Sequence, residues 1–382
     1  MSEATALTPD VIGISTEIGR GHPHYLDCVW QALQARLRPE QLRLATVFAA
    51  SRGRSRLGWQ GLAALYRWSA RSRLSIRLYN SLRRSQPTSP LSLPTKVLGR
   101  DLRRLVAGFK GICLVEHQMV ARMVSDVCRT WFVHADVAAP PECACPGPER
   151  IFVPLEHTAQ HFIKCRCDSS RLVRTGLMIE PDLIPGAHDA FHRRLERLDS
   201  GQPLTIAFFT SGAYPQAHVR RIVLGAESVL RVGMKAIVFC GTNPEFARRM
   251  EHWARKWVAS VFVVHRPTRA ADTAAAVELL PSVDAFVAAS HERTNWALGL
   301  GLPMIALFPM IGTHARQNYD FAFAQNVCYP LRTDDDAQNL GPTVSKLRAA
   351  GALAAMARCG FGRFEINGAG CIADTVVSAL KG

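Results

Sequence analysis

The sequence predicts an α/β protein built from two doubly wound, Rossmann-like domains in tandem. Short runs that are apolar on both faces recur along the chain and alternate with helix-sized segments, which is typical of the strands of a parallel sheet. The alternation stops in a stretch rich in proline, glycine and charged residues at 181–202 and then starts again. The length of 382 residues agrees with two domains at roughly 100–200 residues each.

These strands divide the chain into an N-terminal domain at 1–185, a linker at 186–202 and a C-terminal domain at 203–382. The first series of strands is predicted at 11–14, 44–48, 111–115, 130–133, 150–153 and 172–179. The second series is predicted at 204–209, 235–239, 261–264, 285–288 and 304–308. A last helix is predicted at 372–380, and its packing back on the N-terminal domain is left open.

The charge and the cysteines narrow the class of protein. A net charge of +15 favours an anionic partner such as a nucleic acid, a membrane surface or a phosphorylated ligand. The sequence contains neither a signal-peptide pattern nor an apolar run of about 20 residues, so we expect a cytoplasmic or peripheral protein. The pairs Cys143/Cys145 and Cys165/Cys167 are spaced more tightly than the usual zinc ligands; we expect no metal, but zinc binding by these four stays open.

The segment Ser-Thr-Glu-Ile-Gly-Arg-Gly-His at 15–22 joins a predicted strand to a predicted helix. Its glycines, Gly19 and Gly21, allow a close backbone approach, and the start of a helix offers free N–H groups to an anion. His22 can accept a proton near neutral pH. The alternative is a tight turn with a capping histidine. His24 stands where a dinucleotide-binding loop has its third glycine, so that motif is incomplete.

Small residues follow two predicted strands of the C-terminal domain. Ser211 and Gly212 come after the first strand, and Gly241 comes after the second. Small side chains at such strand ends let a diphosphate approach the backbone amides, since ligands bind beyond the carboxyl ends of parallel strands. Ordinary strand-to-helix turns are the alternative.

Two predicted helix starts in the C-terminal domain carry groups that suit a phosphate. One helix is predicted to begin near Thr294, directly after Arg293, and another over 312–319, where His314 and Arg316 lie. Cationic side chains bind phosphate oxygens strongly. Their clustering at two successive strand ends predicts a phosphate-binding site, although surface charge alone would explain a single arginine.

Several short motifs also follow one another in a set order. They are Gly-Arg-Gly-His at 19–22, Val-Arg-Thr-Gly-Leu-Met-Ile at 173–179, Leu-Pro-Ser-Val-Asp at 280–284, Ala-Leu-Gly-Leu-Gly-Leu-Pro at 297–303 and Arg-Gln-Asn-Tyr at 316–319. With them the chain resembles, nearly end to end, the GT-B glycosyltransferases. Within these it is similar to the branch of the diacylglycerol glycosyltransferases (monogalactosyldiacylglycerol synthase among them) and the N-acetylglucosaminyltransferase of peptidoglycan synthesis.

The resemblance implies a GT-B fold with the active site in the interdomain cleft. It implies inverting, metal-independent transfer of a sugar from a nucleotide-sugar, UDP-sugar first, with no cofactor. The N-terminal domain would bind the acceptor and the C-terminal domain the nucleotide-sugar donor. His22 would be the catalytic base, and Glu116, His117 and Asp136, which end strands of the acceptor domain, are further candidates. The implied donor-binding residues are Gly21, Ser211, Gly212, Gly241, His265, Arg293, Thr294, Asn295, Arg316, Gln317 and Asn318.

The chain departs from the family's usual pattern in two places around the helix that would bind the donor, and the glycine-rich stretch before that helix reads Ser-His-Glu at 290–292. The family carries a glutamate in the donor helix that binds the ribose of UDP, and Trp296 stands in that place, beside Asn295. A changed donor and a lost activity both remain open.

The stretch 52–86 is the best indicator of the acceptor. It contains nine arginines, no acidic residue, and aromatic residues at helical spacing, a composition that suits an anionic bilayer surface. The lipid-glycosylating relatives carry a similar segment there; an amphipathic helix with a solvated arginine face is the alternative. Nucleic acid is not expected, since no recognised motif occurs. The predicted acceptor and membrane residues are Trp59, Tyr66, Trp68, Arg71, Tyr79, His117 and Asp136.

The sequence therefore predicts a glycosyltransferase of a lipid or other hydrophobic acceptor, peripheral on the inner face of a membrane. Three alternatives stay open: a glycosyltransferase of a soluble natural product, a non-catalytic GT-B module that binds a sugar nucleotide or a partner protein, and a sugar-nucleotide epimerase. The sequence names neither the sugar, the nucleotide nor the acceptor.

Overall fold

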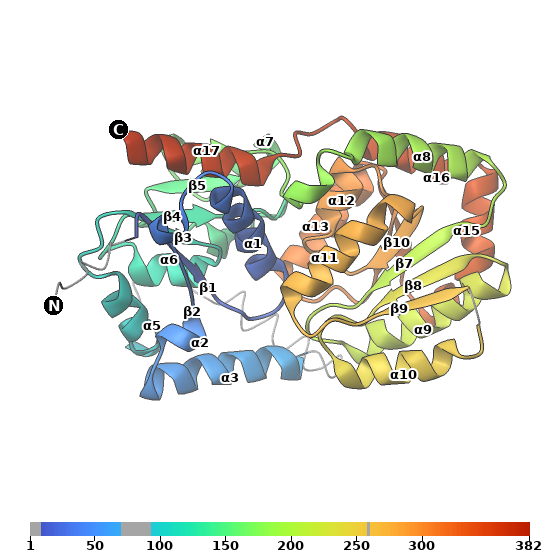
Figure 1. Ribbon diagram of the computed structural model, residues 1–382, viewed down its shortest axis with the longest axis horizontal. Helices are drawn as coiled ribbons and strands as arrows, with labels where there is room; N and C mark the ends of the chain where they lie inside the picture. The colour runs from blue at the N-terminus through green and yellow to red at the C-terminus, as the bar shows by residue number, and fades with distance from the viewer. Residues whose placement is uncertain (1–8, 70–92, 258–259) are drawn as a thin grey trace. The chain divides into compact units, whose positions relative to one another are not determined.

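The computed structural model describes residues 9–69, 93–257 and 260–382 and divides them into two units (Figure 1). The first unit comprises the described residues among 9–66, 93–181 and 367–382, and the second those among 67–69 and 182–366. Each unit holds one six-stranded sheet in which all strands run parallel, with helices between the strands. The predicted class of two Rossmann-like domains is confirmed.

The sheet of the first unit has the strand order β2-β1-β3-β4-β5-β6. Its strands are β1 (Val11–Ser15), β2 (Leu42–Thr46), β3 (Ile112–Val115), β4 (Thr130–Val133), β5 (Arg150–Val153) and β6 (Leu172–Arg174). Its helices are α1 (Gly21–Gln34), α2 (Val47–Ala50), α3 (Gly53–Ser69), α5 (Leu93–Val106), α6 (Gln118–Val124), α7 (Glu156–Lys164) and α17 (Gly368–Lys381). The C-terminal helix α17 thus belongs to the first unit and packs beside α1.

Two predicted strands of this unit end earlier than expected. The second was predicted to include Val47 and Phe48, but both lie in the helix α2. The side chain of Thr46 accepts a hydrogen bond from the N–H of Ala49 at 3.1 Å, so it caps that helix and ends the strand. The strand predicted at 172–179 is regular only as far as Arg174.

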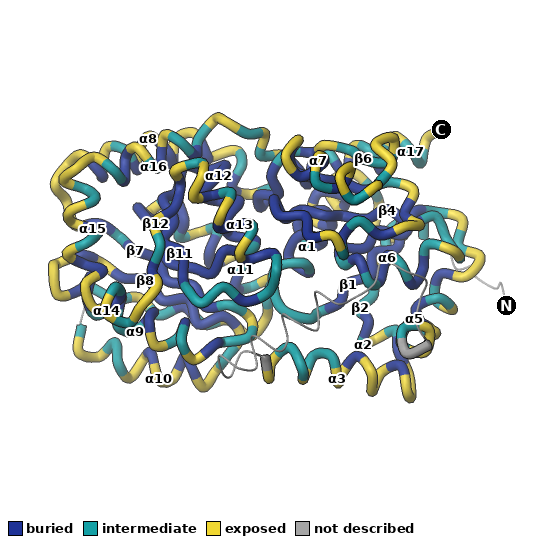
Figure 2. Tube along the Cα trace, turned by 180° about the vertical axis from the view of Figure 1, so that it is seen from behind, coloured by how far each residue is buried: buried dark blue, intermediate teal, exposed yellow. Residues whose placement is uncertain are grey.

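The sheet is covered on both sides, which explains its nearly uninterrupted apolar strands. Successive strand residues face opposite sides: Val11 and Leu114 pack with α1 and α17, whereas Ile12 and Val115 pack with α3, α5 and α6. Figure 2 shows the inner strands as buried and the outer faces of the helices as exposed, while the edge strand β2 is partly exposed.

The sheet of the second unit has the order β12-β11-β10-β7-β8-β9. Its strands are β7 (Thr205–Phe209), β8 (Lys235–Phe239), β9 (Val261–Val264), β10 (Ala285–Ala288), β11 (Met304–Leu307) and β12 (Cys328–Leu331). Its helices are α8 (Ala187–Asp199), α9 (Gln216–Arg231), α10 (Pro244–Ala254), α11 (Arg269–Leu279), α12 (Thr294–Gly299), α13 (Thr313–Ala324), α14 (Asp334–Gln338), α15 (Leu340–Ala349) and α16 (Ala352–Gly360). The sequence analysis missed β12, an edge strand that contains Pro330, as edge strands can.

The segment 186–202, expected to be a linker, is instead built into the second unit as α8. Arg194 is 2% exposed, and its guanidinium donates to the carbonyls of Val283, Leu300 and Gly301 at 2.9 to 3.1 Å. Phe191 packs in the core of the unit. The charged sequence was misleading because this buried guanidinium satisfies backbone carbonyls rather than facing water.

No helix within the described ranges is long and apolar enough to cross a membrane.

Candidate functional site

The strand orders locate one candidate edge in each unit. In the second unit the chain runs from β7 to β8 and β9 on one side and then returns to β10 on the other, so the order reverses between β7 and β10. In the first unit it reverses between β1 and β3. Ligands of open α/β sheets bind beyond the carboxyl ends of the strands at such a point. The loops there are those after β1, β3, β7 and β10, where the sequence placed most of its candidates.

His22 lies in the first turn of α1, directly beyond the loop that follows β1. Its ring meets that of His117 edge-on, with 5.2 Å between the centroids. His117 caps α6, because its Nδ1 accepts the N–H of Met119 at 3.1 Å. A neutral His117 therefore carries its proton on Nε2. The first unit brings these two predicted residues together.

Asp136 belongs to the same group. It is 6% exposed beyond the end of β4, and its Oδ1 accepts a hydrogen bond from the hydroxyl of Tyr25 at 2.9 Å. A ring nitrogen of His22 and a carboxylate oxygen of Asp136 lie within 4.8 Å of each other. The sequence analysis missed Tyr25, although its position three residues after His22 on one helix was a signal.

His134 also follows β4, and its ring is neutral at physiological pH. Its Nε2 donates to the carbonyl of Ala138 at 2.7 Å, and burial lowers the pKa of its ring to about 4. His134 therefore stays neutral above pH 5 and holds the loop after β4 in place.

Glu116 ends β3 and is fully buried. Its Oε1 accepts the N–H of Thr16 at 2.7 Å and the Thr16 hydroxyl at 2.8 Å. Within the described chain its other oxygen, Oε2, is buried with no hydrogen-bond partner. Burial raises the pKa of this carboxyl to about 7, since an ionised group without further donors is costly to bury. Glu116 can therefore hold or release a proton near neutral pH.

The loop after β1 is held in an unusual backbone conformation. Glu17 has φ 52° and Gly19 has φ 78°. A Cβ atom on Gly19 would lie 3.2 Å from the hydroxyl oxygen of Tyr66, so the phenol of α3 packs against this glycine. Tyr66, a predicted acceptor residue, thus contacts the loop that leads to His22.

A second group of titratable side chains, which the sequence analysis did not predict, surrounds His24 of α1. His24 is buried, with Nε2 3.2 Å from a carboxylate oxygen of Glu180 and 3.7 Å from Sγ of Cys28. Burial alone lowers the pKa of His24, but these two contacts hold it well above its ordinary value. We assign the raised pKa of His24 to the carboxylate of Glu180, because burial raises the pKa of the Cys28 thiol and keeps that thiol neutral. The pair fixes the turn that carries His22.

In the second unit, Gly241 and His265 hold each other in place. His265 donates from Nδ1 to the Gly241 carbonyl at 2.8 Å. Gly241 has φ 57°, and a Cβ atom there would lie 2.5 Å from the hydroxyl oxygen of Tyr214. That hydroxyl donates to the Cys240 carbonyl at 2.8 Å. Only glycine fits this turn. The other two small residues predicted to bind the donor follow β7, where Ser211 is half-buried and Gly212 is exposed.

Arg293, expected to bind phosphate, is 5% exposed after β10. Its guanidinium lies 4.4 Å from the ring centre of Phe209 and donates to the carboxylate of Glu292 at 2.9 Å. A diphosphate would have to compete with Glu292 for this charge. Trp296, which stands where the resemblance predicts a glutamate, packs edge-on against Phe209 and is buried.

The loop after β10 and the start of α13 carry buried polar atoms that lack partners. Asn295 is 1% exposed, and Asn318 donates to the Ser290 carbonyl at 3.3 Å. In the described chain the side-chain oxygens of Ser290, Thr294 and Gln317 have no hydrogen-bond partner. Buried polar groups are nearly always paired, so these oxygens mark a place for water or a ligand. Arg316 instead makes an exposed ion pair with Asp320, at 2.9 Å.

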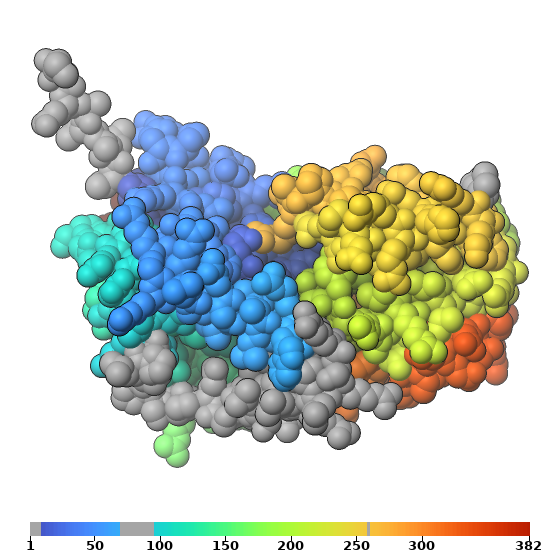
Figure 3. All heavy atoms as spheres, turned by 90° about the horizontal axis from the view of Figure 1, so that it is seen from below, coloured from blue at the N-terminus to red at the C-terminus, as the bar shows by residue number. Residues whose placement is uncertain are grey.

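The other acceptor residues predicted in the stretch 52–86 differ in where they lie. Trp59 is 0% exposed in the core of the first unit, so the expectation that it meets a membrane is wrong. Its helical spacing reflects packing against the sheet. Trp68 is 41% exposed, and Figure 3 shows α3 at the surface. Arg71 and Tyr79 lie outside the described residues.

The structure locates the four cysteines that were considered for zinc. Cys143 and Cys145 are buried and Cys165 and Cys167 half-buried, yet no three of these four described thiols lie mutually within 4.8 Å. Burial raises the pKa of Cys145 to about 12, so it stays a neutral thiol.

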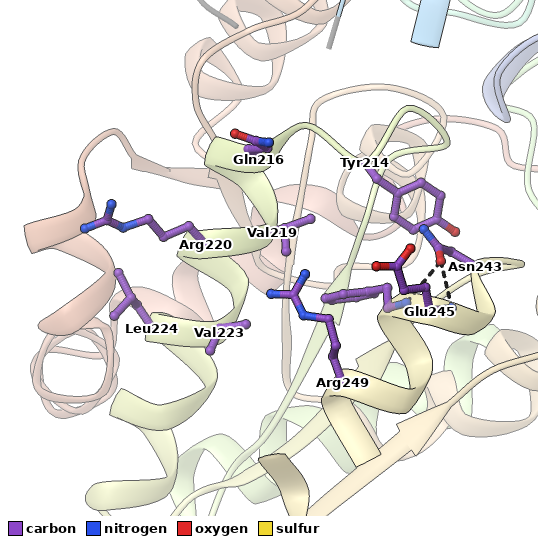
Figure 4. Close-up of a pocket in the computed structure, with 10 residues that line it drawn as sticks. Tyr214, Gln216, Val219, Arg220, Val223, Leu224, Asn243, Glu245 and Arg249 are labelled. Atoms are coloured by element: carbon purple, nitrogen blue, oxygen red, sulfur yellow. Dashed lines mark hydrogen bonds between the residues drawn. The ribbon is translucent and has the colours of Figure 1, made fainter. Parts of the chain in front are cut away.

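A cavity of about 580 Å³ opens between α9 and α10 (Figure 4). Its apolar lining includes Val219 and Phe246, and Tyr214, Asn243 and Arg249 add polar groups. None of the predicted donor-binding residues lines it.

Comparison with known proteins bears on the fold. No protein-family model matches the chain, and no curated protein matches it in sequence. Among solved structures it is similar to UDP-GlcNAc 2-epimerase from Neisseria meningitidis bound to UDP-GlcNAc, with a TM-score of 0.58 and 12% identity over 97% of this chain and 99% of that one. It is similar to MurG from Acinetobacter baumannii, with a TM-score of 0.56 and 11% identity over 97% and 100%. A further match is UDP-GlcNAc 2-epimerase from Methanocaldococcus jannaschii in complex with UDP-GlcNAc and UDP, with a TM-score of 0.55 and 11% identity over 97% and 99%. With two Rossmann-like units and neighbours that match nearly end to end, the chain has the GT-B fold.

Proposed function

We propose that the protein is an inverting, metal-independent glycosyltransferase that moves a sugar from a nucleotide-sugar to a hydroxyl of a hydrophobic acceptor. The observation that carries the proposal is the group formed by His22, Asp136 and Tyr25 at the carboxyl edge of the first sheet. A histidine backed by a carboxylate is suited to take a proton from an attacking hydroxyl.

His22 would act as the general base. As the acceptor oxygen forms its bond to the anomeric carbon, the hydroxyl proton moves to the imidazole and the bond to the diphosphate oxygen breaks. Attack on the side opposite the leaving group inverts the anomeric centre. The carboxylate of Asp136, held by Tyr25, stabilises the imidazolium that forms.

The second unit would bind the donor. The unpartnered oxygens of Ser290, Thr294 and Gln317 supply acceptors for sugar or ribose hydroxyls, and α13 presents its N-terminus to the negative charge of the diphosphate. Charge that develops on the diphosphate needs prearranged donors when no metal assists. We propose UDP as the nucleotide, a choice supported by the UDP-sugars named for the neighbouring structures.

The acceptor is proposed to be a lipid, reached from the cytoplasmic face of a membrane. Helix α3 carries no acidic residue, and its Arg54, Arg56 and Leu57 are exposed. Exposed cations beside an exposed apolar side chain suit an anionic bilayer surface. A soluble acceptor would not need this surface.

The test begins with a thermal-shift screen against UDP-, GDP- and dTDP-sugars and continues with acceptor-dependent release of the nucleoside diphosphate. His22→Ala should lower kcat by about 100-fold or more while leaving the thermal shift by the donor intact. His252→Ala, at an exposed position of α10, is the matched control and should keep full turnover. Unchanged turnover in His22→Ala would exclude His22 as the base, and a shift with none of the donors would favour a non-catalytic module.

A second candidate function is epimerisation of the sugar nucleotide itself. It is favoured by Glu116, a buried carboxyl whose pKa of about 7 suits removal of a carbon-bound proton. Donor incubated alone in D2O distinguishes the two functions. An epimerase incorporates deuterium into the sugar without any acceptor, and a glycosyltransferase does not.

A further inference from the structure

Helix α8 carries two exposed histidines one turn apart that none of the proposed chemistry uses. His188 and His192 lie four residues apart on the same face, and their ring centroids are 4.3 Å apart. Their Nε2 atoms face each other at 3.1 Å. In the metal-free pair one of these nitrogens must donate a proton to the other, so the two rings share a single proton at this contact.

The distance between the two nitrogens matches that of two ligands on one metal ion. Histidine nitrogens bind Zn²⁺ at about 2.0–2.1 Å. Two such nitrogens at an angle between octahedral and tetrahedral, about 90–109°, lie about 2.9–3.4 Å apart. The observed 3.1 Å falls inside this range. A metal ion could therefore replace the shared proton with little movement of either ring.

Packing and hydrogen bonds anchor the part of α8 that carries both rings. Between the two histidines, Phe191 stacks on Phe361 with 4.1 Å between centroids and 7° between planes. One turn further, the buried Arg194 binds three backbone carbonyls. A ligand pair on a helix anchored in this way loses little freedom when the ion binds, which favours binding.

A carboxylate lies on the far side of one ring. Nδ1 of His188 is 3.7 Å from an oxygen of Asp189. Metal-binding histidines commonly direct their second nitrogen toward a carboxylate, which orients the ring and makes the ligating nitrogen more basic. A small movement of the exposed Asp189 would close this contact when the ion is bound.

We propose that His188 and His192, both exposed, form a binding site for a divalent transition-metal ion, such as Zn²⁺, on α8, the helix labelled in Figure 1. Among the described residues no third histidine, cysteine or acidic side chain offers a ligand atom within 4.8 Å of both ligating nitrogens at once. Water completes the coordination, so the ion keeps open positions. Such a site follows the usual order of affinities, with Cu²⁺ bound more tightly than Zn²⁺ and Co²⁺ more weakly than Cu²⁺.

The experiment is a calorimetric titration of the full chain, free of any affinity tag, with Zn²⁺ at pH 7.5. Wild type is compared with His188→Ala and His192→Ala, both exposed positions at which folding is retained. The matched control is the double variant His157→Ala/His161→Ala, which removes the other histidine pair at this spacing, on α7, with 4.4 Å between centroids.

We expect each α8 variant to lose one equivalent of Zn²⁺ or to weaken its binding at least tenfold, while the α7 variant keeps that equivalent. Since the ion replaces a proton, binding should weaken as the pH falls from 7.5 to 5.5. If both α8 variants bind Zn²⁺ as wild type does, or if wild type binds none up to about 1 mM, the pair is only a hydrogen bond and the inference is wrong. If the α7 variant instead loses the bound Zn²⁺, the site lies on α7 and the inference is equally wrong.

Discussion

Replacing Glu116 by glutamine should change how the stability of the first unit depends on pH. Burial raises the pKa of this carboxyl from 4.5 to about 7. Each pKa unit corresponds to about 1.4 kcal/mol, so the shift amounts to about 3 kcal/mol. Below pH 4.5 the folded and unfolded states both carry the proton. Between pH 4.5 and 7 the unfolded state ionises first, and the wild type loses stability as the pH rises.

Glutamine removes this dependence because it does not titrate. Its carbonyl oxygen can still accept from Thr16, and its amide nitrogen takes the place of the unpartnered Oε2. The amide will also lack a partner, which adds a cost that does not depend on pH. The informative quantity is therefore the difference in the free energy of unfolding between variant and wild type, and how that difference changes with pH.

Urea unfolding followed by tryptophan fluorescence at pH 5 and pH 8 measures that change. From pH 5 to pH 8 we expect the free energy of unfolding of Glu116→Gln to rise by about 2–3 kcal/mol relative to that of wild type. Glu40→Gln, an exposed carboxylate of the same unit, controls for the loss of one acidic group. A difference between variant and wild type that stays constant from pH 5 to pH 8 would show that Glu116 does not hold a proton in the folded state.

Four further predictions test other parts of the structure. Trp59→Ala should lower the free energy of unfolding by about 3–5 kcal/mol in urea titrations, since the indole is fully buried; a loss below about 1 kcal/mol would contradict its place in the core. Gly241→Ala should cost about 1–2 kcal/mol and weaken donor binding in thermal-shift assays, because its φ of 57° and the Tyr214 hydroxyl leave no room for a Cβ; an unchanged protein would refute this. His24→Gln should lose stability at pH 6 but approach wild type as the pH rises through the raised pKa of His24, since that contribution is fully present below the unfolded pKa; a constant difference would exclude the ion pair. Replacing Arg54 and Arg56 by glutamate should abolish sedimentation with anionic liposomes at low salt, and equal sedimentation of variant and wild type would argue against membrane contact through α3.

Much of the candidate site followed from the sequence because its residues end strands. His22, His117 and Asp136 come directly after strands or in the first turn beyond them, and parallel strands bring such residues to one edge of the sheet. Their contacts did not follow from the sequence. The hydrogen bond from Tyr25 to Asp136 joins residues 111 positions apart, and no local pattern records it.

Several differences between sequence and structure share one cause, which is that a charged or aromatic side chain looks the same in sequence whether it faces water or the core. Trp59 resembles a membrane anchor in its arginine-rich helix but fills the core of the first unit. The contacts of Arg293 with Phe209 and Glu292 could not be read from the sequence for the same reason, and its role as a phosphate ligand stays a prediction. Arg194 resembles part of a charged linker but binds buried carbonyls.

By itself the sequence determined the two doubly wound sheets, because parallel strands buried on both faces must be apolar along their whole length and must alternate with helices. It also determined which residues end those strands. Only the tertiary structure decided which of these side chains are buried, with which partner, and in which protonation state. The carboxyl of Glu116 shows why: its raised pKa comes from the loss of water around it, and that loss depends on every element packed above it.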